Sequence, residues 1–189
     1  MVHPVTKTFA AILSLALLVS ANSSAEISWS LHPSISGPDG PSAPYVTATL
    51  GPRQIKYVPP IKWKITDTQF IPPGVPGAYA FANAIAIDKP APWTTDRLKT
   101  LHDFILSHLP PGAKDASILS EGPLPVQIDG QPPCEISATY AYYGQTYSES
   151  VIFIERDKTQ FQFHLDCPNP AFPSLHALFL SSLLSLDGI

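Results

Sequence analysis

Charge is scarce in this sequence. Only 14% of its 189 residues are Asp, Glu, Lys or Arg, against about 25% in a typical soluble domain. The 11 Lys and Arg residues are scattered and the net charge is −4, so the chain offers no positive field to a phosphate backbone, and a nucleic-acid partner is disfavoured. Hydrophobic residues, at 44%, are as frequent as in packed proteins, which at this length favours one domain.

The longest apolar run is too short to span a membrane. It lies between Phe9 and Val19, after the basic Lys7, and small residues follow up to Ala25. A transmembrane helix needs about 20 apolar residues. The pattern predicts a signal peptide over residues 1–25, and hence an exported protein, periplasmic or extracellular, with no stable membrane span after cleavage. An uncleaved N-terminal helix is the alternative.

Cysteine is almost absent. Cys134 and Cys167 are the only two, and an oxidising compartment permits a disulfide between them. If the strands between them form an antiparallel meander, the two residues lie at opposite ends of the sheet, about 25 Å apart at about 3.3 Å per residue. A disulfide needs Cα atoms within about 7 Å. We therefore predict two unpaired thiols.

Motifs of catalysis and cofactor binding are also missing from the sequence. It contains no G-x-S-x-G elbow, no phosphate-cradling glycine loop, and no histidine and acid constellation around a cysteine. The carboxylates are dispersed, and no two of them pair on one predicted face. We therefore predict no catalytic residue, no cofactor and a non-enzymatic protein. A small exported hydrolase that uses dispersed carboxylates or His164 is the alternative.

Proline punctuates the first part of the chain after the signal peptide. Ten prolines lie between residues 26 and 77, which excludes a long helix there. Residues 26–43 have no apolar period and are predicted to form a Pro-rich, extended, partly ordered lead-in. A single α+β domain then covers residues 44–189, with short strands expected at residues 45–50 and 61–65.

The middle of the chain predicts one strand and one helix. Tyr79, Phe81 and Ile85 alternate with alanines, which favours a strand over residues 78–87, with a helix as the runner-up. A helix is predicted from residue 94 or 95 to residue 109, because its leucines and isoleucine repeat every three or four positions. A threonine side chain at its start is expected to cap it.

The stretch between residues 130 and 186 has the strongest pattern. It predicts three consecutive antiparallel strands and one amphipathic helix, at residues 136–143, 150–156, about 160–165 and 172–186. Residues 151–154 are apolar on both parities, so the second strand should be central and covered on both faces. In the third strand Phe161 and Phe163 are predicted to face inward, and Gln160, Gln162 and His164 to face water.

Four residues of this stretch are candidates for binding. Tyr143 and Tyr147 flank a predicted turn, and tyrosine combines a flat apolar ring with a polar tip, as protein contact surfaces require. His164 and Asp166 lie two residues apart on one face of the third strand. Two ligands are too few for a metal site, so no metal is predicted and this pair is expected to face solvent.

The arrangement of short motifs resembles a known family. The resemblance rests on five motifs: residues 129–132 (DGQP) opening a strand, Tyr140-Ala141-Tyr142, the strand that ends at Arg156, Phe161-Gln162-Phe163, and Phe172 followed by Leu175, Phe179 and Ser182. Over about residues 78–186 this pattern resembles the PsbP-like domain, which shares its α/β/α sandwich with the Ran-binding Mog proteins.

The resemblance implies both a fold and a kind of function. The implied fold is α+β, a central antiparallel β-sheet with helices on both faces. The family is one of non-catalytic binding and assembly domains, so the resemblance implies an unknown protein partner and no catalytic residue. The predicted signal peptide argues against a nuclear, Ran-type partner. The sequence thus predicts a protein-binding or assembly accessory of the cell envelope or exterior.

Overall fold

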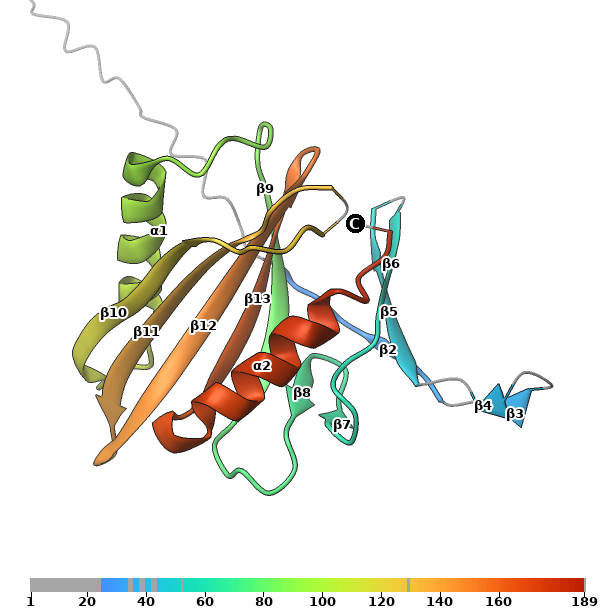
Figure 1. The fold of residues 1–189 in the computed structure, drawn as a ribbon, viewed down its shortest axis with the longest axis horizontal. Helices are drawn as coiled ribbons and strands as arrows, with labels where there is room; N and C mark the ends of the chain where they lie inside the picture. The colour runs from blue at the N-terminus through green and yellow to red at the C-terminus, as the bar shows by residue number, and fades with distance from the viewer. Residues whose placement is uncertain are drawn as a thin grey trace, which may run out of the picture.

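The computed structural model describes residues 25–33, 36–37, 40–41, 44–51, 53–128 and 130–188. Within these residues the chain is an α+β protein with more strand than helix, and every strand pair is antiparallel (Figure 1). The predicted signal peptide lies outside the described residues except for Ala25.

The main sheet is built from eight strands. They are β1 (Ala25–Glu26), β7 (Lys64–Ile65), β8 (Gln69–Ile71), β9 (Tyr79–Ala86), β10 (Lys114–Pro123), β11 (Cys134–Tyr142), β12 (Gln145–Arg156) and β13 (Thr159–Pro168). Their order is β10-β11-β12-β13-β9-β8-β7, and β1 also pairs with β9. The predicted meander is therefore confirmed as β11, β12 and β13. The central position of β12 is confirmed too, since Val151 and Ile152 are fully buried.

A smaller sheet stands beside the main one (Figure 1). It contains β2 (Ser30–His32), β5 (Tyr45–Leu50) and β6 (Arg53–Tyr57), and a short hairpin of β3 (Ser36–Gly37) and β4 (Gly40–Pro41) precedes β5. The strand predicted at residues 45–50 is confirmed with the same bounds.

The strand predicted at residues 61–65 is wrong for most of its length. Only Lys64 and Ile65 pair with another strand. The Trp63 amide donates a hydrogen bond to the Pro60 carbonyl at 3.2 Å, and Lys62 has a φ of 70°. These residues therefore form a turn, which leaves Ile61 83% exposed despite the alternating sequence.

The segment predicted as a lead-in supplies two side chains to the core. Ile27 and Trp29 are 2% and 4% exposed. The Trp29 ring packs 5.8 Å from the rings of both Tyr57 and Phe70. The Ile27 amide donates to the Ala82 carbonyl at 2.8 Å, which continues the contact between β1 and β9. The apolar core therefore reaches back to Ile27.

Two helices pack beside the main sheet. Helix α1 (Thr95–His108) contacts β10 and β11, and α2 (Phe172–Leu183) contacts β13 (Figure 1). Both predicted helices are confirmed, although α2 ends three residues early in a series of turns. The expected threonine cap is wrong: Thr94 occupies the N-cap position, but within the described residues its side chain makes no capping hydrogen bond.

The buried apolar residues of the described chain form two clusters. One cluster joins α1 to two strands through Leu101, Ile105, Cys134, Ile136, Ala138, Val151 and Phe153. The other includes α2 and the small sheet, with Ile152, Ile154, Phe161, Phe163, Phe179 and Leu183 among its members. Because successive strand residues point to opposite faces, Val151 and Ile152 belong to different clusters.

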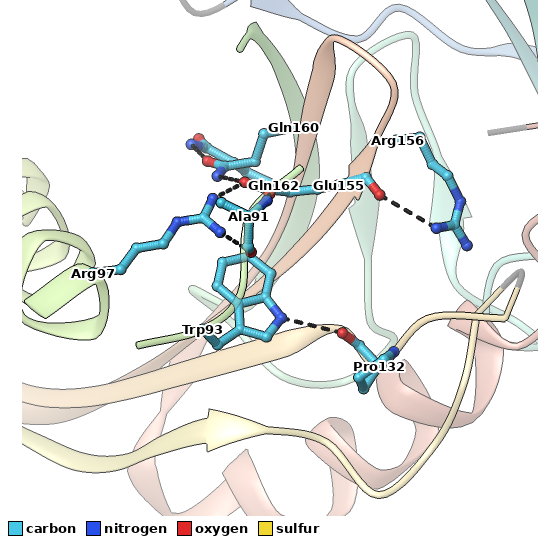
Figure 2. A network of polar contacts seen from close by, with 8 residues as sticks. All are labelled: Ala91, Trp93, Arg97, Pro132, Glu155, Arg156, Gln160 and Gln162. Atoms are coloured by element: carbon cyan, nitrogen blue, oxygen red, sulfur yellow. Dashed lines mark hydrogen bonds and ion pairs between the residues drawn. The ribbon is translucent and has the colours of Figure 1, made fainter. Parts of the chain in front are cut away.

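The polar face of β13 is buried, so the prediction that it meets water is wrong. Gln160, Gln162, His164 and Asp166 are all 6% exposed or less. The segment before α1 covers one end of this face (Figure 2): the Ala91 amide donates to Glu155 at 3.1 Å, and Arg97 pairs with the same carboxylate. Gln160 Nε2 donates to Glu155 Oε1 at 2.7 Å, so the buried Gln160 and Glu155 side chains satisfy each other at this end of the face.

Candidate binding site

Five tyrosines form a band on the face of the main sheet that carries Gln160, Gln162, His164 and Asp166. The band lies at the end of this face that is remote from Glu155. We define the tyrosine band as Tyr79, Tyr140, Tyr142, Tyr143 and Tyr147. Register pairs Tyr140 with Tyr147 across β11 and β12, and their rings stack 5.7 Å apart. Tyr142 lies edge-on to Tyr143 at 4.4 Å and to Tyr147 at 6.2 Å. The band therefore runs from the hairpin tip to the interior of the sheet.

The outer end of the band is held by a tight turn. Tyr143 and Gly144 join β11 to β12 with φ values of 46° and 76°, the pattern of a type I′ hairpin turn. Glycine adopts such angles without strain, whereas a tyrosine does so rarely. The turn leaves the Tyr143 side chain 90% exposed.

The inner end of the band meets the carboxylate of Asp166. Strand pairing places Asp166 opposite Tyr79 on one side and Glu149 on the other. Asp166 Oδ2 accepts hydrogen bonds from the Tyr140 hydroxyl at 2.6 Å and from the Tyr79 hydroxyl at 3.3 Å. Asp166 is only 5% exposed, so a carboxylate is held inside the protein by two phenols.

Burial changes the acid–base behaviour of this cluster. Loss of water raises the pKa of Asp166 to about 6. The hydrogen bonds from Tyr140 and Tyr79 lower this pKa and the charge of the nearby Glu149 raises it, but burial is the largest cause. Burial and the Asp166 charge raise the pKa values of Tyr79 and Tyr140 well above the usual range. Both phenols therefore stay protonated and act as hydrogen-bond donors.

His164 and Glu149 form a second polar pair next to Asp166. His164 Nδ1 lies 3.1 Å from Glu149 Oε1, and an ionised carboxylate only accepts, so Nδ1 carries the proton. The imidazole stacks on the Phe81 ring at 4.3 Å. His164 Nε2 and Asp166 Oδ1 are buried and have no hydrogen-bond partner among the described residues.

A pocket of about 580 Å³ opens beside this pair. It lies between the sheet and the end of α1. Its lining residues are Phe81, Asn83, Ile85, Phe104, His108, Glu149 and His164. The His108 ring lies 4.1 Å from the Phe104 ring, and its Nδ1 is 2.7 Å from the Phe104 carbonyl oxygen. Phe81, Ile85 and Phe104 make the pocket mainly apolar, and the pair of His164 and Glu149 lies in its wall.

The structure brings the four predicted binding residues to one face. Tyr143 and Tyr147 belong to the tyrosine band, and His164 and Asp166 lie at its inner end. The expectation that His164 and Asp166 face solvent is wrong, because His164 is buried against the Phe81 ring and Asp166 beneath the Tyr79 and Tyr140 hydroxyls.

Sequence reasoning missed Glu149, Tyr79 and Phe81 as members of this site. Glu149 lies at an alternate position of the same strand as Val151 and Phe153. Its side chain could therefore have been predicted to lie on the same face of the sheet as theirs. Tyr79 and Phe81 join the site because β9 pairs with β13, a contact between segments about 80 residues apart in the chain. No local pattern contains that pairing.

Two further histidines are paired with carboxylates elsewhere. His102 Nε2 lies 3.3 Å from Glu121, and His176 Nε2 lies 2.5 Å from Glu135. Ser150 also donates to Glu135 at 2.6 Å, so its hydroxyl contacts the acid and not the imidazole. This is not the arrangement of a nucleophile with its base. Among the described residues, no three His, Cys, Asp or Glu side chains are placed to hold a metal ion.

The two cysteines belong to different apolar clusters, Cys134 with α1 and Cys167 with α2. Within the described residues both are free and fully buried. Burial raises the pKa of Cys134 to about 11 and that of Cys167 to about 12. The thiolate is the reactive form, so neither residue should react readily in the folded chain.

We therefore expect both thiols to be silent toward Ellman's reagent until the protein unfolds. The native mature chain should release almost no thionitrobenzoate, and the chain in denaturant should release the equivalent of its two cysteines. Non-reducing peptide mapping supplies the control, because a linked pair of cysteine peptides would also explain silence. A fast native reaction of either thiol would contradict the burial.

None of the helices in the described part of the chain is long and apolar enough to cross a membrane.

Fold and site together define a small sheet-rich α+β domain that carries tyrosine and acidic side chains on one face of its sheet. No family model matches the chain, and no curated protein matches it. Among solved structures it is similar to the solution structure of cyanobacterial PsbP (CyanoP) from Synechocystis sp. PCC 6803. The two share 14% identity over 86% of this chain and 93% of that chain, with a TM-score of 0.43. The resemblance to PsbP-like domains that the sequence predicts is thus found among solved structures.

Proposed function

We propose that this chain is an exported, non-enzymatic binding domain, an assembly accessory of the cell envelope or exterior that recognises a protein partner through the tyrosine band. The observation that carries the proposal is Tyr143, which is 90% exposed on a tight hairpin turn and packs at 4.4 Å against Tyr142. Tyrosine has few rotatable bonds, so a supported, exposed ring binds with little loss of entropy.

The arrangement behind the turn supports a contact surface. Tyr142 and Tyr147 are half-buried and continue the band inward. Tyr140 and Tyr79 are fixed by their hydrogen bonds to Asp166. An exposed aromatic residue backed by ordered aromatic neighbours is typical of the central residues of protein interfaces.

The fold that we propose for this domain is an α/β/α sandwich with one helix on each face of the sheet. The division of the core supports it. Leu101 and Ile105 of α1 pack with Val151, whereas Phe179 of α2 packs with the cluster of Ile152, and adjacent strand residues face opposite sides.

Replacing Tyr143 is expected to reduce partner capture. The tagged chain is expressed with its own signal peptide and recovered from the envelope or medium, and recovery only from the cytoplasm would contradict export. We expect Tyr143→Ala to weaken binding to the captured partner about 30-fold or more, as for a central interface residue. Ile61→Ala is the control, because Ile61 is also large and exposed, at 83%, but lies outside the band.

Two outcomes of this comparison contradict the proposed surface. One is equal binding by the native chain and the Tyr143→Ala variant. The other is an equal loss with Ile61→Ala, which would place the contact elsewhere or indicate nonspecific adhesion. Circular dichroism spectra of both variants check that the fold is retained.

A small exported hydrolase is the second candidate, and the pair of Glu149 and His164 favours it. A carboxylate that holds an imidazole at 3.1 Å orients it as a general base. In the described residues the side-chain hydrogen bond of His164 goes to Glu149, and no nucleophilic hydroxyl or thiol bonds to it. Turnover of nitrophenyl esters or glycosides that disappears in His164→Gln would support the hydrolase and overturn the non-enzymatic proposal.

A further inference from the structure

The pocket beside His164 has apolar and aromatic side chains in its walls. Phe81 and Ile85 of β9 and Phe104 of α1 supply apolar and aromatic walls. Its volume of about 580 Å³ falls within the range of about 300–1,000 Å³ that is common for small-molecule sites. The Phe81 ring stacks on the His164 ring with an angle of 9° between them, which fixes the orientation of Phe81.

The charge that faces the pocket is negative. Glu149 from β12 lines it, together with His164 from β13 and His108 from α1. Asp166 lies behind this wall, opposite Glu149 in the strand pairing. Of the described residues that line the pocket, none is Lys or Arg, so Glu149 has no basic side chain beside it other than histidine. A carboxylate in such surroundings favours a cationic partner.

We propose that this pocket binds an organic cation, a guanidinium, amidinium or ammonium group carried on a flat or apolar body. Glu149 accepts hydrogen bonds from the cationic group, and the Phe81 and Phe104 rings contact its body and attract its charge through their π faces. His164 keeps Glu149 in place through Nδ1.

This inference does not depend on the tyrosine band binding a protein. Probe binding is measured on the mature chain alone, without a partner, so either proposal can fail while the other stands. The cation could belong to a free small molecule or to an arginine or lysine side chain of a polypeptide, and the chemistry of recognition is the same for both.

Benzamidine is the probe that tests the proposal, because it joins a planar amidinium to an aromatic ring of suitable size. We expect saturable one-to-one binding by isothermal titration calorimetry. Benzamide, its neutral isostere, and benzoate, its anionic analogue, should bind about tenfold more weakly or not at all, since neither offers a cation to Glu149. Equal binding of benzamide or benzoate, or no binding of benzamidine, would overturn the proposal.

Substitutions locate the site of binding. Glu149→Gln should weaken benzamidine binding about 10- to 100-fold, the usual effect of removing a charged hydrogen-bond acceptor. Glu121→Gln is the matched control, because Glu121 also pairs with a histidine, His102 at 3.3 Å, but lies outside the pocket. Unchanged binding in a folded Glu149→Gln variant would overturn the assignment.

A second variant keeps the test decisive if Glu149→Gln fails to fold. Ile85→Trp fills the pocket from β9, where Ile85 is only partly buried, and leaves Glu149 and His164 in place. It should abolish benzamidine binding while the far-ultraviolet circular dichroism spectrum stays the same. Retained binding in this variant would place the cation elsewhere.

A third probe distinguishes the two sources of the cation. N-acetyl-argininamide carries the guanidinium on a capped backbone, as a polypeptide does. Binding as tight as that of benzamidine would support a partner side chain as the natural occupant, whereas much weaker binding would support a free ligand. Both results agree with a cation site, provided that Glu149→Gln weakens whichever probe binds.

Discussion

Asp166→Asn will remove a large part of the pH dependence of the free energy of unfolding between about pH 4 and pH 6. Burial raises the pKa of Asp166 from 3.8 to about 6 in the folded protein. The folded state therefore holds this proton more tightly than the unfolded state does. The resulting stability is fully present below pH 3.8 and is lost as the pH rises through about 6.

The size of this effect follows from the shift. One pKa unit corresponds to about 1.4 kcal/mol, so ionisation of Asp166 removes on the order of 3 kcal/mol of stability across this window. The groups around it are Glu149, His164, Tyr79 and Tyr140. All of them remain in the asparagine variant, so the difference between the native chain and the variant isolates Asp166.

Denaturant unfolding at a series of pH values measures this difference. Asp88→Asn is the control, because Asp88 is exposed and should leave the pH profile of the native chain unchanged. Parallel profiles for the native chain and Asp166→Asn would contradict the burial of an ionisable Asp166. Glu135 changes stability in the opposite direction, since hydrogen bonds from His176 and Ser150 outweigh its burial and lower its pKa.

Trp29→Ala is expected to destabilise the protein by about 3–5 kcal/mol, the usual cost of removing a large core side chain. The Trp29 indole is 4% exposed and packs against both Tyr57 and Phe70, at 5.8 Å from each ring. Its removal leaves a cavity where the small sheet meets the main one. The midpoint of denaturant unfolding should fall while the slope of the transition stays the same.

The adjacent Ser28→Ala is the control for Trp29→Ala. Ser28 is exposed on the same segment and should change stability little. A negligible effect of Trp29→Ala would support the prediction that residues 26–43 are an extended, partly ordered lead-in, which rests on their lack of an apolar period. A large effect would show that the folded unit begins before residue 44.

Local patterns were sufficient where each strand or helix depends on its own residues. The strand at residues 45–50, the helix α1 and the meander of β11, β12 and β13 follow from alternation and helical spacing. Where a turn interrupts an alternating run, as at Lys62, the pattern misleads, because the backbone leaves the strand while the sequence continues to alternate.

The site was predictable only in part. The sequence indicates Tyr143, Tyr147, His164 and Asp166. Because side chains alternate between the two faces of a strand, residues 164 and 166 must lie on the same face. The burial of this face was not predictable. Polar residues on alternate positions normally face water, but here His164 stacks on Phe81, and Asp166 accepts hydrogen bonds from Tyr79 and Tyr140.

The sequence by itself determined the strand order from β11 to β13, the central place of β12 and the amphipathic helices, since each follows from local hydrophobic periods. Only the tertiary structure decided that β9 pairs with β13, that Glu149 meets His164, and that Asp166 is buried under two tyrosines. These contacts join segments distant in the chain, and their free energy depends on desolvation, which the order of residues along one strand does not specify.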